Sequence, residues 1–221
     1  MRRAFLAWLF PSVAFAAPNE IKVFTDELAA YREHTLELHA NRGGGRTRFM
    51  PEYSYGAWSG WEASLQLPLA WSDGVRSEGY RGELQYVAPH DTAAGWYWGI
   101  NAELARVEPL GEEHFWSIEL IPIAGWRGGA WHLAVNPGGT AALSGTERKR
   151  SFDPAGMISY AFAPHSAFGF EYYAEGETRS RSLYLAWNGK IGKSDVNAGV
   201  GRGLSGTADR WVVKTIVEIA F

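Results

Sequence analysis

Cysteine is absent from the 221-residue chain, which excludes disulfide scaffolds, thiolate zinc sites and cysteine nucleophiles. A basic excess is also missing: 21 Lys and Arg stand against 24 Asp and Glu, so the electrostatic footprint of a nucleic-acid binder is not present. After residue 17 no apolar run approaches the roughly 18 residues that a transmembrane helix needs. Aromatic residues are abundant, at 14%, which excludes a disordered chain. The length fits one domain, or at most two.

The first 16 residues predict a secretory signal peptide. Arg2 and Arg3 precede an apolar stretch, and Ala14-Phe15-Ala16 forms an A-x-A cleavage pattern. Cleavage after Ala16 removes two of the 21 basic residues and leaves 19 against 24 acidic ones. The exported chain is therefore mildly acidic.

From residue 33 to residue 221 apolar and polar residues alternate with a period of two, which indicates β-strands with one apolar face. Twelve such segments are present, of which residues 49–57 and 152–162 are the least regular. A mature chain of about 205 residues gives about 17 per strand and connection, which suits short turns between strands of 9–11 residues. If the two irregular segments are misread, the count falls to ten. No linker or second domain is indicated.

The connections are predicted from clusters of turn-forming residues. Asn136-Pro137-Gly138-Gly139 predicts a turn, so Pro137 to Arg150 is expected to be the longest loop. Residues 19–32 lack alternation, and residues 17–32 are expected to form a periplasmic N-terminal segment. One or two helical turns are expected from Thr25 to Tyr31, at the periplasmic mouth of the barrel.

The two faces of the strands favour a membrane barrel, which carries apolar residues outside and polar ones inside. The polar face carries many charges and the apolar face almost none. Trp61 and Trp71 share one face ten residues apart, about 33 Å of strand. At a tilt of about 45° this covers about 23 Å, close to the ~25 Å apolar band of outer-membrane barrels.

The chain ends on an apolar strand face whose alternation continues to Phe221. It resembles the C-terminal assembly signal of Gram-negative outer-membrane β-barrel proteins, carried here by Trp211, Val213, Thr215, Val217, Ile219 and Phe221. The stretch from Ile21 to Ala29, followed by Leu36 to Asn41, resembles a group of uncharacterised proteobacterial outer-membrane proteins labelled as transporters or porin-like. The resemblance implies an all-β, antiparallel, up-and-down transmembrane barrel in the outer membrane. It implies no particular substrate.

The polar face supplies the candidate site residues. The predicted lumen-lining set is Glu37, His39, Glu52, Glu62, Arg81, Glu83, Glu103, Glu119, His132, Glu171, Lys214 and Glu218. In one interpretation these charges line a narrow passive pore for small solutes, which the acid excess makes weakly cation-favouring. In the other they pair with one another and fill a non-conducting structural barrel.

An outer-membrane lipid-modifying enzyme is the less favoured alternative. A barrel phospholipase needs a serine activated by a histidine on one strand face, and no histidine here has a serine two positions away. We therefore predict no enzyme and no catalytic residue. No single strand offers several metal ligands in a recognisable spacing, so neither a metal site nor a cofactor is predicted.

The expected partners follow from this architecture. They are outer-membrane lipids, the barrel-assembly machinery through the C-terminal strand, and small solutes or ions. An even strand number places both termini in the periplasm, so the loop that contains Glu147-Arg148-Lys149-Arg150 is extracellular. Its basic residues suit contact with lipopolysaccharide phosphates. No nucleic-acid partner is expected.

Overall fold

The computed structural model describes residues 21–71, 74–111, 113–145, 149–205 and 208–221. The predicted signal peptide lies outside these residues, so its limits stay a prediction. Within the described ranges there is no helix with the length and apolar character needed to cross a membrane.

The described chain is all-β, and its strand segments follow one another in sequence around a single sheet. Their bounds are β1 His34–Gly43, β2 Arg46–Trp58, β3 Trp61–Gln66, β4 Leu69–Trp71, β5 Val75–Ser77, β6 Gly79–Val87, β7 Gly95–Val107, β8 Phe115–Gly128, β9 Trp131–Ala142, β10 Arg150–Ala163, β11 Ser166–Glu175, β12 Ser180–Ile191, β13 Ser194–Gly203 and β14 Val212–Ala220.

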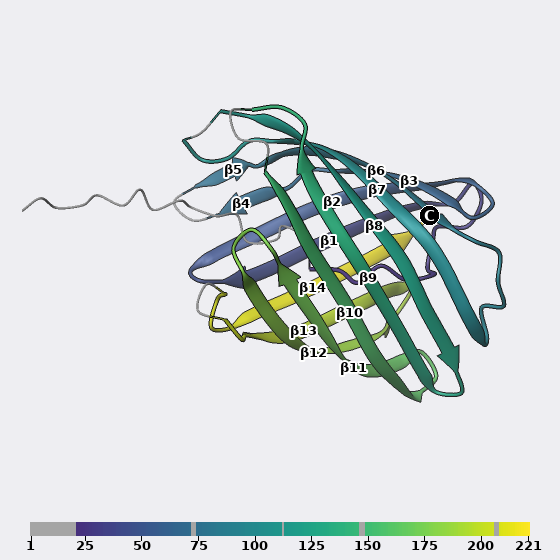
Figure 1. Ribbon diagram of the computed structural model, residues 1–221. Coiled ribbons are helices and arrows are strands. Elements are labelled where there is room, and N and C mark those ends of the chain that lie inside the picture. The colour runs from purple at the N-terminus through teal and green to yellow at the C-terminus, as the bar shows by residue number, and fades with distance from the viewer. Residues whose placement is uncertain (1–20, 72–73, 112, 146–148, 206–207) are drawn as a thin grey trace, which may run out of the picture.

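These segments form a closed antiparallel barrel of twelve strands, which confirms the predicted fold. The strand that follows β2 is interrupted at Leu67-Pro68, and β2 pairs with both of its parts, β3 and β4. Its neighbour is interrupted at Glu78, which separates β5 from β6. The sheet closes because β1 pairs with β2 on one side and with β14 on the other. Figure 1 shows the resulting ring of tilted strands.

The turn predicted at Asn136–Gly139 is wrong. Strand β9 continues through it to Ala142, with Pro137 directly opposite Pro154 of β10. Proline has no backbone N–H to donate, so two prolines that face each other leave no ladder hydrogen bond unmade between them. On the other side of β9, the pairing with β8 is interrupted at the same level, between Leu120↔Gly139 and Ala124↔Val135. Sheet pairing on both sides therefore outweighs the local turn preference. The connection is shorter than expected, residues 143–149, and 146–148 of it lie outside the described residues.

The barrel is inside out compared with a soluble one, as predicted. Large apolar side chains point outward: Leu67 is 48% exposed and Leu185 54%. Polar side chains such as Glu52, Gln66 and Asn101 are completely buried. Tryptophans are exposed on the outer surface near the strand ends, among them Trp71, Trp96, Trp131 and Trp211. This is the surface pattern of a barrel whose outer solvent is lipid.

The two ends of the barrel differ. At the Phe221 end, the chain terminus bonds to the start of β1, with Phe221 N donating to His34 O at 2.9 Å. Two-residue turns at 59–60, 129–130, 164–165 and 192–193 share this end with one longer connection at 88–94. The opposite end, called the far end below, carries the connections at 44–45, 108–114, 143–149, 176–179 and 204–211.

Candidate functional site

The interior of the barrel is the candidate site, and the predicted lumen-lining residues lie there. Eight of the twelve are buried: Glu37, His39, Glu52, Glu62, Glu83, Glu103, Glu171 and Lys214. Arg81, Glu119, His132 and Glu218 are partly buried. Their alternation with exposed apolar neighbours places them on the inner face. That they line a conducting path stays a prediction.

Carboxylates lie directly opposite one another on neighbouring strands. Glu37 of β1 faces Glu218 of β14 on one side and Glu52 of β2 on the other. Glu103 of β7 faces Glu83 of β6 and Glu119 of β8. Asp195 of β13 faces Glu218, and the carboxylate of Glu62 lies within 4.8 Å of those of Glu52 and Glu83. We call the whole set the acidic arc, and it comprises Asp195, Glu218, Glu37, Glu52, Glu62, Glu83, Glu103 and Glu119. Like charges directly opposite in a sheet destabilise it unless cations or protons compensate them.

Basic side chains meet the acidic arc at several points. Lys22 Nζ lies 3.1 Å from both carboxylate oxygens of Glu37, and Arg81 Nη1 donates to Glu103 at 3.2 Å. Lys190 pairs with Asp195 at 2.7 Å. Other basic groups have carboxylates outside the arc, the pairs being Arg48 with Glu78, Arg127 with Asp26 and Lys214 with Glu171. The arc is therefore a strongly acidic part of the wall.

Residues 21–33, which we call the lumenal segment, run through the interior without helix or strand structure. Asp26 contacts Arg127 near the Phe221 end, and Phe24 contacts Asn136 in the middle of β9. Ile21 O accepts a hydrogen bond from Lys214, two residues inside the far-end start of β14. The segment thus extends from one end of the barrel well toward the other. The expected helical turns at the mouth are wrong.

The wall holds the lumenal segment mainly by its backbone. Asn136 Oδ1 accepts from Phe24 N at 2.8 Å, and Asn136 Nδ2 donates to Phe24 O at 3.0 Å. Glu62 Oε2 accepts from Ala29 N at 2.5 Å, and Gln85 donates to Thr25 O at 3.3 Å. These wall residues satisfy backbone groups that would otherwise be buried without partners, which is costly.

Two small apolar clusters form around side chains of the lumenal segment. Phe24 packs with Tyr97, Ile121 and Ile123 of the wall. Ile21 packs with Tyr173 and Tyr184. Burying these side chains stabilises the inserted position by the hydrophobic effect.

Asp26 is the most heavily bonded charge of the lumenal segment. Arg127 contacts both its carboxylate oxygens, the shortest distance being 2.6 Å, and His90 Nε2 lies 3.0 Å from Oδ2. Burial opposes the charge of Asp26, but the bonds from Arg127 and His90 outweigh it and lower the pKa of the carboxyl. Burial likewise opposes the charge of His90, yet bonds to Ala88 O and Asp26 raise its pKa.

Sequence reasoning placed the wall residues but not their grouping. His39 and His132 both belong to the predicted lumen-lining set. The structure separates them: His132 bonds to the Tyr97 hydroxyl at 2.7 Å, whereas His39 lies between Glu37 and Glu52. The roles of Asn136, Gln85 and Arg127 were missed, because contacts with a segment 60 to 112 residues away leave no local pattern.

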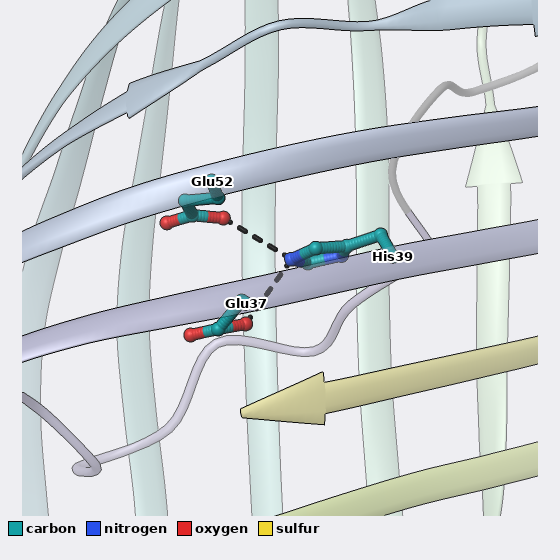
Figure 2. A group of neighbouring side chains, drawn as sticks. All are labelled: Glu37, His39 and Glu52. Carbon is teal, nitrogen blue, oxygen red and sulfur yellow. Dashed lines mark ion pairs between the residues drawn. The ribbon is translucent and has the colours of Figure 1, made fainter. Parts of the chain in front are cut away.

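A triad of Glu37, His39 and Glu52 forms on the acidic arc (Figure 2). Glu37 and His39 are two residues apart on β1, so their side chains share a face, and Glu52 lies opposite Glu37 on β2. His39 Nε2 is 3.1 Å from Glu37 Oε2 and 3.1 Å from Glu52 Oε2. All three side chains are buried. The arrangement brings one imidazole and two carboxylates to a common point.

Comparison with solved structures identifies the architecture. An outer-membrane channel of the COG4313 group from Pseudomonas putida F1 matches with a TM-score of 0.68 and 14% identity, over 91% of this chain and all of the other. The KdgM porin matches with a TM-score of 0.60 and 13% identity, over 85% and 99%. The chain has the fold of outer-membrane β-barrel channels. Neither the family models nor the curated proteins contain a match to the sequence.

Proposed function

We propose that the protein is an outer-membrane barrel that forms a narrow, passive, weakly cation-favouring pore for small solutes. The acidic arc is the observation that carries this proposal. Eight carboxylates gathered on the inner wall create a negative potential, which attracts cations and excludes anions. A hydrated lumen also lowers the cost of keeping so many carboxylates ionised.

The membrane location rests on the outer surface. Exposed apolar side chains between bands of tryptophan suit a lipid environment with interfaces at both ends. With an even strand number both termini share one side, which we propose is the periplasm, as the short turns at the Phe221 end also favour. Phe221 and its strand face are then the signal for the assembly machinery. At the far end Lys149, paired with Glu177 at 3.0 Å, would face lipopolysaccharide.

The lumenal segment sets how open this pore is. It occupies the interior along much of its length and brings Lys22 against Glu37 of the acidic arc. We propose that the inserted segment gives a state of low conductance and that its release widens the path. The segment joins β1 directly, so it can leave the lumen without breaking a strand pair.

The charge of the lumen favours a different class of solute from the one bound by a structurally similar porin. One KdgM porin structure is described as a complex with an oligogalacturonate, which is a polyanion. The acidic arc would repel such a ligand. Small cations or neutral solutes suit this lumen better.

A non-conducting structural barrel is the second candidate, and the lumenal segment favours it. Its apolar clusters and backbone bonds resemble the filling of a solid interior. In this alternative the Glu–Arg and Glu–Lys contacts stabilise the barrel and have no role in transport.

Planar-bilayer recording of the refolded protein tests the proposal. The wild type should conduct in small steps with a cation-selective reversal potential in a salt gradient, and the preference should weaken at high salt. The double variant Glu83→Gln/Glu119→Gln should reduce cation preference without unfolding the barrel. The variant Asn136→Ala/Arg127→Gln, which weakens the hold on the lumenal segment, should raise conductance. The matched change Thr140→Ala, on the same strand β9 but bonded to Asp153 rather than to the lumenal segment, should leave it unchanged.

The alternative makes opposite predictions. If the charges are structural, Glu83→Gln/Glu119→Gln lowers thermal stability, and neither the wild type nor the segment-releasing variant conducts. That result would replace the pore with the structural barrel.

A further inference from the structure

The triad of Glu37, His39 and Glu52 has the donor set of a metal site. Zn²⁺ and related ions bind histidine nitrogen and carboxylate oxygen at about 2.0–2.2 Å. For angles of about 90–110° at the ion, the ligand atoms lie about 2.8–3.6 Å from one another, by simple geometry from those lengths. His39 Nε2 lies 3.1 Å from one oxygen of each glutamate, and the three donor atoms all fall within 4.8 Å of one another. The spacing therefore fits a shared ion.

A hydrogen bond from His39 fits this geometry less well than a shared metal ion does. A single N–H on His39 Nε2 points in one direction and serves one carboxylate well, whereas both oxygens lie at the same 3.1 Å. A metal ion placed between the three atoms serves both carboxylates at once. Figure 2 shows the two carboxylates approaching the same edge of the imidazole.

Glu52 provides a second observation that points to a ligand. Its side chain is 0% exposed, and within the described residues its Oε2 atom accepts no hydrogen bond although it is directed at His39. The other oxygen, Oε1, accepts from Ser54 at 3.3 Å, which orients the carboxylate. A buried carboxylate oxygen without a hydrogen bond is costly, and coordination to a cation removes that cost.

We infer that Glu37, His39 and Glu52 form a binding site for a divalent transition-metal ion of the zinc class in the lumen wall. Lys22 shares this site, because its ammonium lies 3.1 Å from both oxygens of Glu37. Metal binding and the Lys22 contact compete for one carboxylate. The site stands on the side-chain geometry alone and does not require that the barrel conducts.

The test is a titration of the refolded, chelator-treated full-length mature protein with Zn²⁺, followed by calorimetry. Binding should be saturable, with one ion per chain. Removing an outer-shell partner of a ligand costs about 10–100-fold in metal affinity, so His39→Leu and Glu52→Gln should each weaken binding by at least about tenfold. Lys22→Met, which removes the competing ammonium, should tighten it. His132→Leu, a lumenal histidine outside the triad, is the matched control and should have no effect.

A spectroscopic measurement on the wild type keeps the inference testable if a variant fails to fold. Cu²⁺ binds such N/O sites tightly, and its electron paramagnetic resonance spectrum should show coupling to one histidine nitrogen. The absence of saturable Zn²⁺ binding in both the wild type and Lys22→Met would overturn the inference. So would binding that is unchanged in both His39→Leu and Glu52→Gln, or a copper spectrum without nitrogen coupling. None of these results depends on conductance.

Discussion

Asn136 pairs with Phe24 as a neighbouring strand would, accepting from its N–H at 2.8 Å and donating to its C=O at 3.0 Å. One wall side chain thereby fixes the middle of the lumenal segment. The two residues are 112 positions apart in the sequence.

Asn136→Leu should release the lumenal segment. It leaves the backbone N–H and C=O of Phe24 buried without a partner, at a cost of about 1–3 kcal/mol for each group. Because the chain has no cysteine, a spin label at Glu27→Cys reports on the segment alone. The label should become more mobile in Asn136→Leu. In the control Thr140→Val, on the same strand as Asn136 but with its hydroxyl bonded to Asp153 instead, it should stay as in the wild type. Equal mobility in all three proteins would refute this role of Asn136.

The hold on Asp26 should depend on pH. His90 has a raised pKa, so its ion pair with Asp26 is present at lower pH and is lost as the pH rises through that value. The lowered pKa of Asp26 keeps its carboxylate charged throughout this window. Arg127 and His132 also face Asp26, and Glu27 faces Arg127. Arg127 holds Asp26 at every pH used.

The same spin label should therefore be less mobile at pH 5.5 than at pH 9. His90→Gln should remove most of that difference, and Arg127→Gln should increase mobility at both pH values. A pH dependence that persists unchanged in His90→Gln would assign it to another group.

Gly125 makes room for the ring of Tyr97. The two residues are direct partners across β7 and β8, and a Cβ added at Gly125 would lie 2.1 Å from Tyr97 Cζ. Gly125→Ala should lower the free energy of unfolding by about 1–3 kcal/mol, as overpacking does. Gly82→Ala is the control, because an added Cβ there meets nothing within 4 Å. Urea unfolding in lipid vesicles measures both. Equal effects would show that Tyr97 moves aside freely.

A charged side chain introduced on the outer surface of the barrel should destabilise it. Leu185 lies in the middle of β12 between Phe170 and Val200 and is 54% exposed. Leu185→Arg should destabilise the barrel by about 2–4 kcal/mol in vesicles if the position is near the bilayer midplane. Leu110→Arg, in an exposed connection outside the strands, should cost little. If both changes cost the same, Leu185 faces water and the inside-out assignment is wrong.

The period of two predicted about twelve strands and which residues share a face, because side-chain direction in a strand follows directly from sequence position. Closure and the inward direction of the polar face were predicted from the tryptophan spacing and from the resemblance of the C-terminal strand. It failed where a contact links distant segments. Pro137 was predicted to start a loop because local preference ignores the pairing with Pro154. The lumenal segment was placed at the mouth because nothing in its own residues indicates Asn136 or Glu62. The triad was missed because its ligands come from two strands.

Side chains of the barrel wall hydrogen-bond to the main chain of the lumenal segment at Ile21, Phe24, Thr25 and Ala29. Every residue except proline offers the same N–H and C=O groups. Thr25 and Ala29, which the wall holds through their main chain, can therefore vary in sequence during evolution without losing these bonds, whereas Asn136, Glu62 and Lys214 cannot. Among relatives with this arrangement, variation should gather at such positions of the segment, and constancy at the wall residues and at the side chains of Ile21, Phe24 and Asp26.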